Sequence, residues 1–228
     1  MGIKYEEVVP WGRTYEEYAD MFGLTEKDLD KYILGCGDGP ASFNSHMMQL
    51  GKRVVSIDPI YQFSREEIEQ RIEETYHKVI SQTEQNLDRF IWSKIKNVEE
   101  LGRIRMAAMN DFLADYEAGR RAGRYAYAEL PELPFENNQF DLALASHFLF
   151  LYTDNLSLDF HIRSIDEMLR ISKEIRIFPL MDVNAVRSSY ADQIIEWYKG
   201  FDYSVEEAAV NYEFQKGGNT MLKIVKKC

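Results

Sequence analysis

The sequence predicts an α/β fold, doubly wound, in which helices cover both faces of a mostly parallel sheet. Three observations support this fold class. Short apolar or β-branched runs alternate with segments of helical periodicity. A glycine-rich turn follows the first such run, and a hairpin pattern closes the chain. With 228 residues and 45% hydrophobic content, the chain is expected to form a single domain over residues 1–228.

The N-terminal segment, residues 1–30, is expected to be helical. Residues 14–22 have an amphipathic pattern, and Thr14 is a suitable cap for a helix. A second short helix is expected at 25–30, where the capping residues have the right spacing.

A β-α-β unit is expected over residues 31–58. Lys31–Leu34 predicts a short buried strand that runs into the glycine turn. Pro40 suits the first position of a helix, which should stop at Gly51. Arg53–Ile57 then predicts a second parallel strand. The crossover between the two strands should be right-handed.

Residues from about 64 to 120 interrupt this alternation with a helical insertion. Apolar residues recur there at helical spacing within a charged background, which predicts two or three helices. Ser64, with Glu67 three residues later, predicts the first cap. The insertion could form a lid or a homodimer surface, and a solvated helical layer is the equally open alternative.

The later elements complete the sheet. The expected strands are Tyr125–Ala128, Phe140–Ser146 and Glu174–Leu180, and the expected helices are Asn155–Ser172 and Ser189–Lys199. The closing hairpin is expected to pair Val210–Phe214 with Met221–Val225 across a glycine-containing turn.

The glycine turn at Gly35, Gly37 and Gly39 is the first candidate for a ligand site. Glycine permits positive φ angles and lets a ligand approach the main chain, and a helix opening after the turn would present free N–H groups. A dinucleotide fingerprint would need a glycine at Pro40 or Ser42, and a phosphate loop would need a Lys-Ser/Thr pair. A turn that merely ends a strand is the alternative.

Asp58 ends the next expected strand and is the second candidate. An acidic side chain at this place can accept both hydroxyls of an adenosine ribose. The alternative is that Asp58 only caps a turn before Pro59.

These segments resemble a known family. ILGCGDG, RVVSIDP and AELPELPFENNQFDLALASHFLFLY, in this order, resemble the motifs of class I S-adenosylmethionine-dependent methyltransferases. WGRTYEEYADMFGL and DPIYQFSREEIEQRI resemble an uncharacterised bacterial group of this class. The resemblance implies a seven-stranded, Rossmann-like sheet with an antiparallel last strand, and S-adenosylmethionine as cofactor.

The resemblance also implies which residues bind the cofactor. These are Gly35, Cys36, Gly37, Gly39, Asp58, Pro59, Ile60, Glu129, Leu130 and Ser146. Cys36 is expected behind the cofactor, Asp58 at the ribose, Glu129 near the adenine amine, and Pro59, Ile60 and Leu130 at the ring. The sequence departs from the family at Ile33, where many members carry an acid, and at Glu129, where aspartate is more usual. Arg170–Lys173 replaces a glycine pair.

His147 is the candidate catalytic base, because it follows the strand Phe140–Ser146 at the edge where ligands bind in such folds. The alternative is a histidine packed among the neighbouring phenylalanines. Arg13 is the candidate partner of the cofactor carboxylate, and a plain surface arginine is the alternative. The expected function is methyl transfer to a small-molecule acceptor. A non-catalytic sensor or interaction protein that keeps the cofactor site is the rival.

Composition argues against several other classes of function. A net charge of −11 argues against nucleic acid and anionic membranes as partners. The cluster Arg120, Arg121 and Arg124 is expected to complement a helix end. The four histidines have no ligand spacing, so no metal is expected. Two cysteines and no apolar run of membrane-spanning length predict a cytoplasmic protein.

Overall fold

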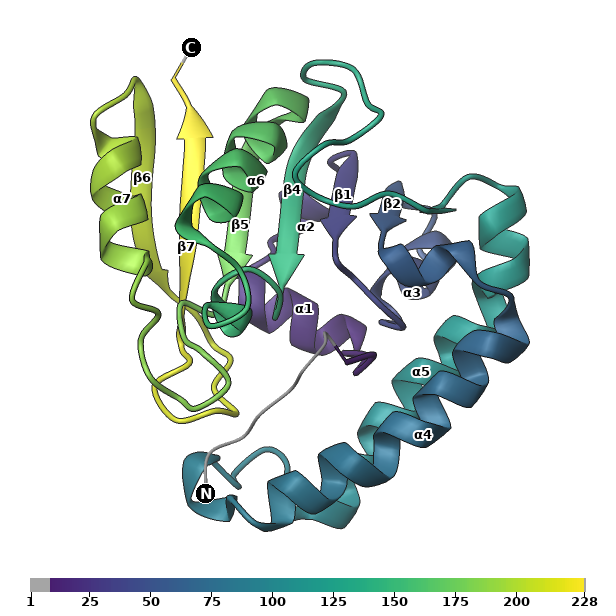
Figure 1. Ribbon diagram of the computed structural model, residues 1–228. Coiled ribbons are helices and arrows are strands. Elements are labelled where there is room, and N and C mark those ends of the chain that lie inside the picture. Colours follow the sequence, from purple (N-terminus) through teal and green to yellow (C-terminus); the bar gives the residue numbers. More distant parts are fainter. Residues whose placement is uncertain (1–8, 228) are drawn as a thin grey trace.

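The computed structural model describes residues 9–227, which form a seven-stranded sheet with helices on both faces (Figure 1). The strand order is β3-β2-β1-β4-β5-β7-β6, and β7 alone runs antiparallel to the other six strands. The strands are β1 Ile33–Cys36, β2 Val54–Ile57, β3 Tyr125–Ala126, β4 Phe140–Ser146, β5 Ser172–Phe178, β6 Tyr203–Ala209 and β7 Thr220–Lys226. The mixed, mostly parallel sheet predicted from the sequence is confirmed.

The helices form two layers around this sheet. They are α1 Tyr15–Phe22, α2 Glu26–Leu29, α3 Phe43–Gln49, α4 Arg65–Glu84, α5 Val98–Arg121, α6 Leu158–Ile171 and α7 Ala191–Lys199. Side chains of α1 and α3 form the core with one face of the sheet, and those of α6 and α7 with the other. No helix among residues 9–227 is both long and apolar enough to cross a membrane.

The first β-α-β unit is present, but its boundaries differ from the prediction. Strand β1 is Ile33–Cys36 rather than Lys31–Leu34, so the first glycine of the turn lies inside the strand. The helix expected at Pro40 begins only at Phe43. Gly39, just before the expected start, has a left-handed φ of 53°. The N–H of Ser42 is also already bonded to a carbonyl of the N-terminal segment, 3.0 Å away.

The closing hairpin starts earlier in the chain than predicted. Its first strand is β6, Tyr203–Ala209, whereas the expected strand Val210–Phe214 lies in the connection to β7. Strand β6 is at the sheet edge, and its side chains are mostly exposed or half-buried. It therefore lacks the apolar alternation by which a strand is recognised in a sequence. The connection instead carries Tyr212 and Phe214 toward the centre of the molecule.

The helical segment between β2 and β3 is an antiparallel pair, α4 and α5, which we call the arm (residues 64–121). Ser64 and Glu67 form the predicted capping box at its start. Figure 1 shows the two helices side by side, reaching from the β2 side of the sheet toward the loops after β5 and before β7. At its tip, the N–H of Ile91 donates to the carbonyl of Phe214 at 2.7 Å. The assignment as an insertion into a single domain stays a prediction.

The base of the arm has its own aromatic core, and this leads to a stability prediction. Phe112 of α5 is fully buried among Tyr61, Tyr116 and Tyr125. Phe112→Ala should lower the free energy of unfolding by about 3–5 kcal/mol, because the lost contacts leave a cavity. Urea denaturation followed by circular dichroism measures this loss. Met48→Ala, at an exposed position of α3, should stay within about 0.5 kcal/mol of the parent. Equal losses would contradict the packing described.

Candidate functional site

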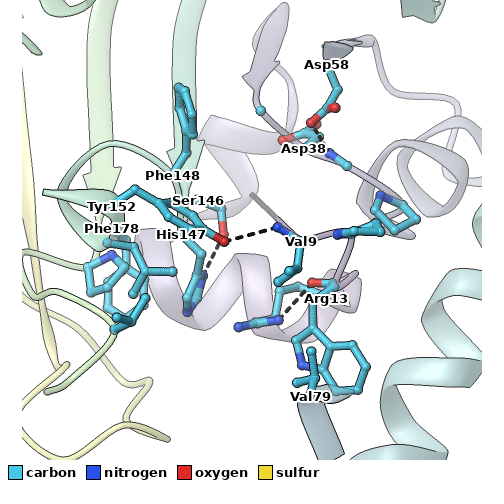
Figure 2. Close-up of a pocket in the computed structure, with 18 of the residues that line it drawn as sticks. Val9, Arg13, Asp38, Asp58, Val79, Ser146, His147, Phe148, Tyr152 and Phe178 are labelled. Carbon is cyan, nitrogen blue, oxygen red and sulfur yellow. Dashed lines mark hydrogen bonds between the residues drawn. The ribbon is translucent and has the colours of Figure 1, made fainter. Parts of the chain in front are cut away.

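A partly enclosed cavity of about 470 Å³ lies at the carboxyl edge of the parallel strands. In α/β sheets of this kind, ligands bind at that edge. The cavity is bounded by the turns after β1, β2 and β4, by α4 and α5 of the arm, and by the β6–β7 connection. Figure 2 shows the residues that these separate segments bring together. Of the predicted cofactor residues, nine line it: Arg13, Gly37, Gly39, Asp58, Pro59, Ile60, Glu129, Leu130 and Ser146.

Gly35 and Cys36, by contrast, are not on the cavity wall. Both belong to β1, and Cys36 is fully buried in the core between the sheet and α6. Glycine is therefore required at the three positions of the turn for different reasons. Gly37 and Gly39 have φ angles of 67° and 53°, which side chains disfavour. Gly35 makes room, because a Cβ there would lie 1.8 Å from Oδ2 of Asp38.

Asp38 is a cavity residue that the sequence analysis missed. Its carboxylate is buried and accepts hydrogen bonds from the hydroxyls of Tyr18, at 2.9 Å, and Ser56, at 2.5 Å. Burial raises the pKa of Asp38 to about 7; the two hydrogen bonds oppose this rise and the nearby charge of Asp58 adds to it. The sequence carries one signal for this residue: an acid lies within the glycine turn, three residues after a glycine.

Asp58 immediately follows β2 and faces the glycine turn. Its Oδ2 accepts the N–H of Gly39 at 2.8 Å, and its Oδ1 accepts that of Ile60 at 2.9 Å. Burial raises the pKa of Asp58 to about 6, although both backbone bonds act against it. Asp58 is thus the cap of the following turn, as the alternative interpretation held. Since each carboxylate oxygen has a second lone pair, the side chain can still accept ligand hydroxyls.

The side of the cavity next to Asp58 is apolar. Pro59, Ile60 and Leu130 contribute to its wall, and Leu130 is buried. Glu129, which the resemblance places near an adenine amine, also lines this part and is solvent-exposed. The wall can therefore contact a flat apolar ring while a carboxylate stays in reach at its rim.

Ser146 and His147 mark the end of β4. His147 has a φ of 51°, a strained conformation for a residue other than glycine. Its Nδ1 lies 2.9 Å from Oγ of Ser146, and its ring meets the edge of Phe178. Burial lowers the pKa of His147 well below its usual value, and the charges of Arg13 and Arg105 lower it further. The imidazole is therefore neutral at physiological pH, and the two arginine charges oppose its protonation.

Two arginines line the same part of the cavity as His147. Nη1 of Arg13 donates to the carbonyl of Trp11 at 2.8 Å, while its Nε is buried without a hydrogen-bond partner. Arg105 of α5 is fully buried and bonds both carboxylate oxygens of Glu17, at 2.6 Å for the Nη2–Oε1 pair. Burial would raise the pKa of Glu17, but Arg105 and Arg13 lower it to about 2. Arg13 thus lacks the carboxylate partner that Arg105 has.

Residues from the arm and the β6–β7 connection complete the cavity, and the sequence analysis did not find them. The arm contributes Val79, Phe90 and Leu101, and the connection contributes Tyr212 and Phe214. These residues lie far apart in the chain, so no local pattern links them to the glycine turn. Within residues 9–227, no group of three or more His, Cys, Asp or Glu side chains is arranged to hold a metal ion.

No family model matches the sequence. The chain is 35% identical to the uncharacterized protein MJ0045 of Methanocaldococcus jannaschii, over 97% of this chain and 98% of that protein. This relative does not confirm the bacterial grouping expected from the sequence.

Solved structures share the architecture at low sequence identity. The PH0226 protein of Pyrococcus horikoshii OT3 matches with a TM-score of 0.50 and 11% identity, over 94% of this chain and 91% of that chain. A SAM-dependent methyltransferase from Aquifex aeolicus gives a TM-score of 0.42 and 14% identity, over 92% and 87% of the two chains. The match to PH0226 shows a common fold, and the strand order with an antiparallel β7 confirms the Rossmann-like sheet expected from the sequence. By its identity to MJ0045 over nearly its whole length, the chain belongs to the family of that protein.

Proposed function

We propose that the protein is an S-adenosylmethionine-dependent methyltransferase that acts on a small-molecule acceptor. The observation that carries this proposal is one cavity at the carboxyl edge of the sheet. That cavity joins the Gly37–Gly39 turn, Asp58 and Glu129 to the neutral imidazole of His147. A fold alone does not establish a reaction, so the reaction is inferred from these side chains.

The residues present fit the cofactor. Asp58 would accept the ribose hydroxyls, and Pro59, Ile60 and Leu130 would contact the adenine ring, with Glu129 at its amine. The backbone at Gly37 and Gly39 has no Cβ that would hinder the ligand. Gly35 and Cys36 would support the site from behind, and Ser146 would lie beside it.

Arg13 would bind a carboxylate in this cavity. Its Nε is buried without a partner, and burial lowers its pKa, which shows that its charge is poorly compensated. The carboxylate of the cofactor's methionine part would satisfy it. This observation favours the cofactor-binding role over a plain surface arginine.

When bound, the cofactor supplies a methyl group that its sulfonium charge already activates. The protein's main task is then to orient the acceptor in line with that group and to exclude water. His147 would accept a proton from an acceptor that must lose one. Its lowered pKa keeps the imidazole neutral but also makes it a weak base, so this role suits an acceptor that is itself acidic. The hydroxyl of Ser146, 2.9 Å from Nδ1, would fix the orientation of the ring.

A small molecule suits the remaining space better than a macromolecule does. The arm and the β6–β7 connection close over the His147 side of the cavity, where Phe90 and Phe214 stack at 4.9 Å. Leu101 of α5 and Leu151 add apolar side chains to the cavity lining. A net charge of −11 also opposes a nucleic-acid acceptor.

The rival function, a sensor that binds the cofactor without catalysis, would leave no room for an acceptor beside His147. The cavity instead continues past His147 to the apolar side chains of the arm, which favours an enzyme. A homodimer formed through the arm and a cytoplasmic location remain predictions.

Ligand titration tests the cofactor assignment. Isothermal titration calorimetry with S-adenosylhomocysteine should show micromolar binding to the wild type. Asp58→Asn keeps the shape of the side chain but removes its charge, and should weaken binding about tenfold, or ~1.4 kcal/mol. Asp154→Asn, an exposed acid outside the cavity, is the matched control and should bind like the wild type. A folded wild type that binds neither S-adenosylmethionine nor S-adenosylhomocysteine would exclude the proposed cofactor.

The pH dependence of binding tests the same carboxylate. The ionised form of Asp58 is the better acceptor for ligand hydroxyls, and burial raises its pKa to about 6. Binding should therefore be tightest at pH 8 and should weaken as the pH falls through 6, because ligand binding must then displace a proton. Asp58→Asn should show a flatter profile between pH 5 and 8. Identical profiles for both proteins would rule out Asp58 as the titrating group.

A further inference from the structure

The carboxylate of Asp38 is buried in the cavity wall without a counter-ion. The residue is 7% exposed, and its oxygens accept hydrogen bonds only from the neutral hydroxyls of Tyr18 and Ser56. No basic group within residues 9–227 forms an ion pair with it, and the nearest charge that affects its pKa is that of Asp58, of the same sign. Because a buried carboxylate is costly without an opposite charge, this position favours a cation supplied by a ligand.

The position of Asp38 explains a departure of the sequence from its relatives. Many class I methyltransferases carry an acid two residues before the first glycine, where this chain has Ile33. Side chains at positions 33 and 35 of a strand lie on the same face. Since Gly35 has no side chain, the Asp38 carboxylate fills the space above it, next to Ile33 on that face. The negative charge at this place is thus carried by Asp38 of the turn rather than by a residue of strand β1.

A positive charge lacking its own partner lies in the same cavity. Arg13 has a buried Nε without a hydrogen-bond partner. Tyr18 lies close to both groups: its hydroxyl donates to Asp38, and its pKa, which burial raises, is partly lowered by the charge of Arg13. Figure 2 shows both side chains at the cavity, Asp38 beside Asp58 and Arg13 farther from it. One anion and one cation complement an α-amino acid group, which carries an ammonium and a carboxylate.

We propose that Asp38 binds the α-ammonium group of the cofactor's methionine part, while Arg13 binds its α-carboxylate. This assignment rests on the proposed function and deepens it, because it names the feature that distinguishes the cofactor from a simple nucleoside. Asp58 and the apolar residues beside it recognise the nucleoside, and the pair of Asp38 and Arg13 recognises the amino acid. The cavity thereby selects adenosine ligands that carry a zwitterionic tail.

Three ligands separate these contributions in calorimetric titrations at pH 8. S-adenosylhomocysteine has the whole tail, its deaminated analogue lacks only the ammonium, and methylthioadenosine lacks both charged groups. Asp38→Asn should weaken S-adenosylhomocysteine about tenfold, since a charge-assisted hydrogen bond is lost. It should leave the affinities for the deaminated analogue and for methylthioadenosine within about twofold. Arg13→Gln should weaken the first two ligands and spare methylthioadenosine, and Asp58→Asn should weaken all three.

A matched variant separates charge from local packing. Ser56→Ala removes one hydrogen bond to Asp38 but keeps the carboxylate, so it should retain the preference for S-adenosylhomocysteine over the deaminated analogue. If Asp38→Asn affects all three ligands equally, or affects none of them, the assignment of Asp38 is wrong. The proposed cofactor still stands in that case, provided that the wild type binds the ligands. A wild type that binds none of them would overturn both. Thermal unfolding of each variant confirms that the compared proteins are folded.

Discussion

The buried ion pair between Arg105 and Glu17 holds together the three segments that enclose the cavity. Arg105 belongs to α5 of the arm, Glu17 to α1, and Tyr212, whose hydroxyl donates to Glu17 at 2.9 Å, to the β6–β7 connection. The same carboxylate accepts the N–H of Thr14 at the start of α1. Leaving one member of such a pair without its partner costs about 3–5 kcal/mol. This carboxylate therefore fixes the middle of the arm over the sheet edge, while the contacts of Ile91 and Phe90 with Phe214 hold its tip.

Much of the sheet could be predicted because burial on both faces leaves a local signal. Phe140–Ser146 was expected as a buried strand and is β4 with the same bounds. The caps at Thr14 and Ser64 were also recognisable, since a capping box depends on residues three positions apart. Strand β6 was missed because an exposed edge strand lacks the apolar face that would show as an alternating pattern in the sequence. Its hydrophobic successors, Tyr212 and Phe214, were mistaken for the strand because they are buried by the cavity instead.

The residues of the candidate site also fall into two groups, those that local sequence could predict and those that it could not. Asp58 was predicted because it directly follows a recognisable strand, and His147 because it follows another. Asp38 does not directly follow a strand that the sequence pattern predicts. The direction of its side chain depends on the missing Cβ of Gly35 and on hydroxyls from α1 and β2. Arg105 is one of many arginines in an amphipathic arm, and only tertiary contacts show that it faces inward. When distant segments of the chain form the surroundings of a residue, no local sequence pattern predicts its role.

Glu17, beside the cavity, stays ionised, whereas Asp38 and Asp58 in the cavity wall titrate near neutrality. Arg105 and Arg13 lower the pKa of Glu17 to about 2, so the pair that positions the arm keeps its charge throughout the physiological range. Asp38 and Asp58, buried without cations, have pKa values raised to about 7 and 6. Their charge is destabilising in the free protein above those values, because the unfolded chain ionises near pH 4. A positive ligand charge beside Asp38 would reduce that cost for Asp38, so part of the ligand's binding free energy would come from this unpaired carboxylate.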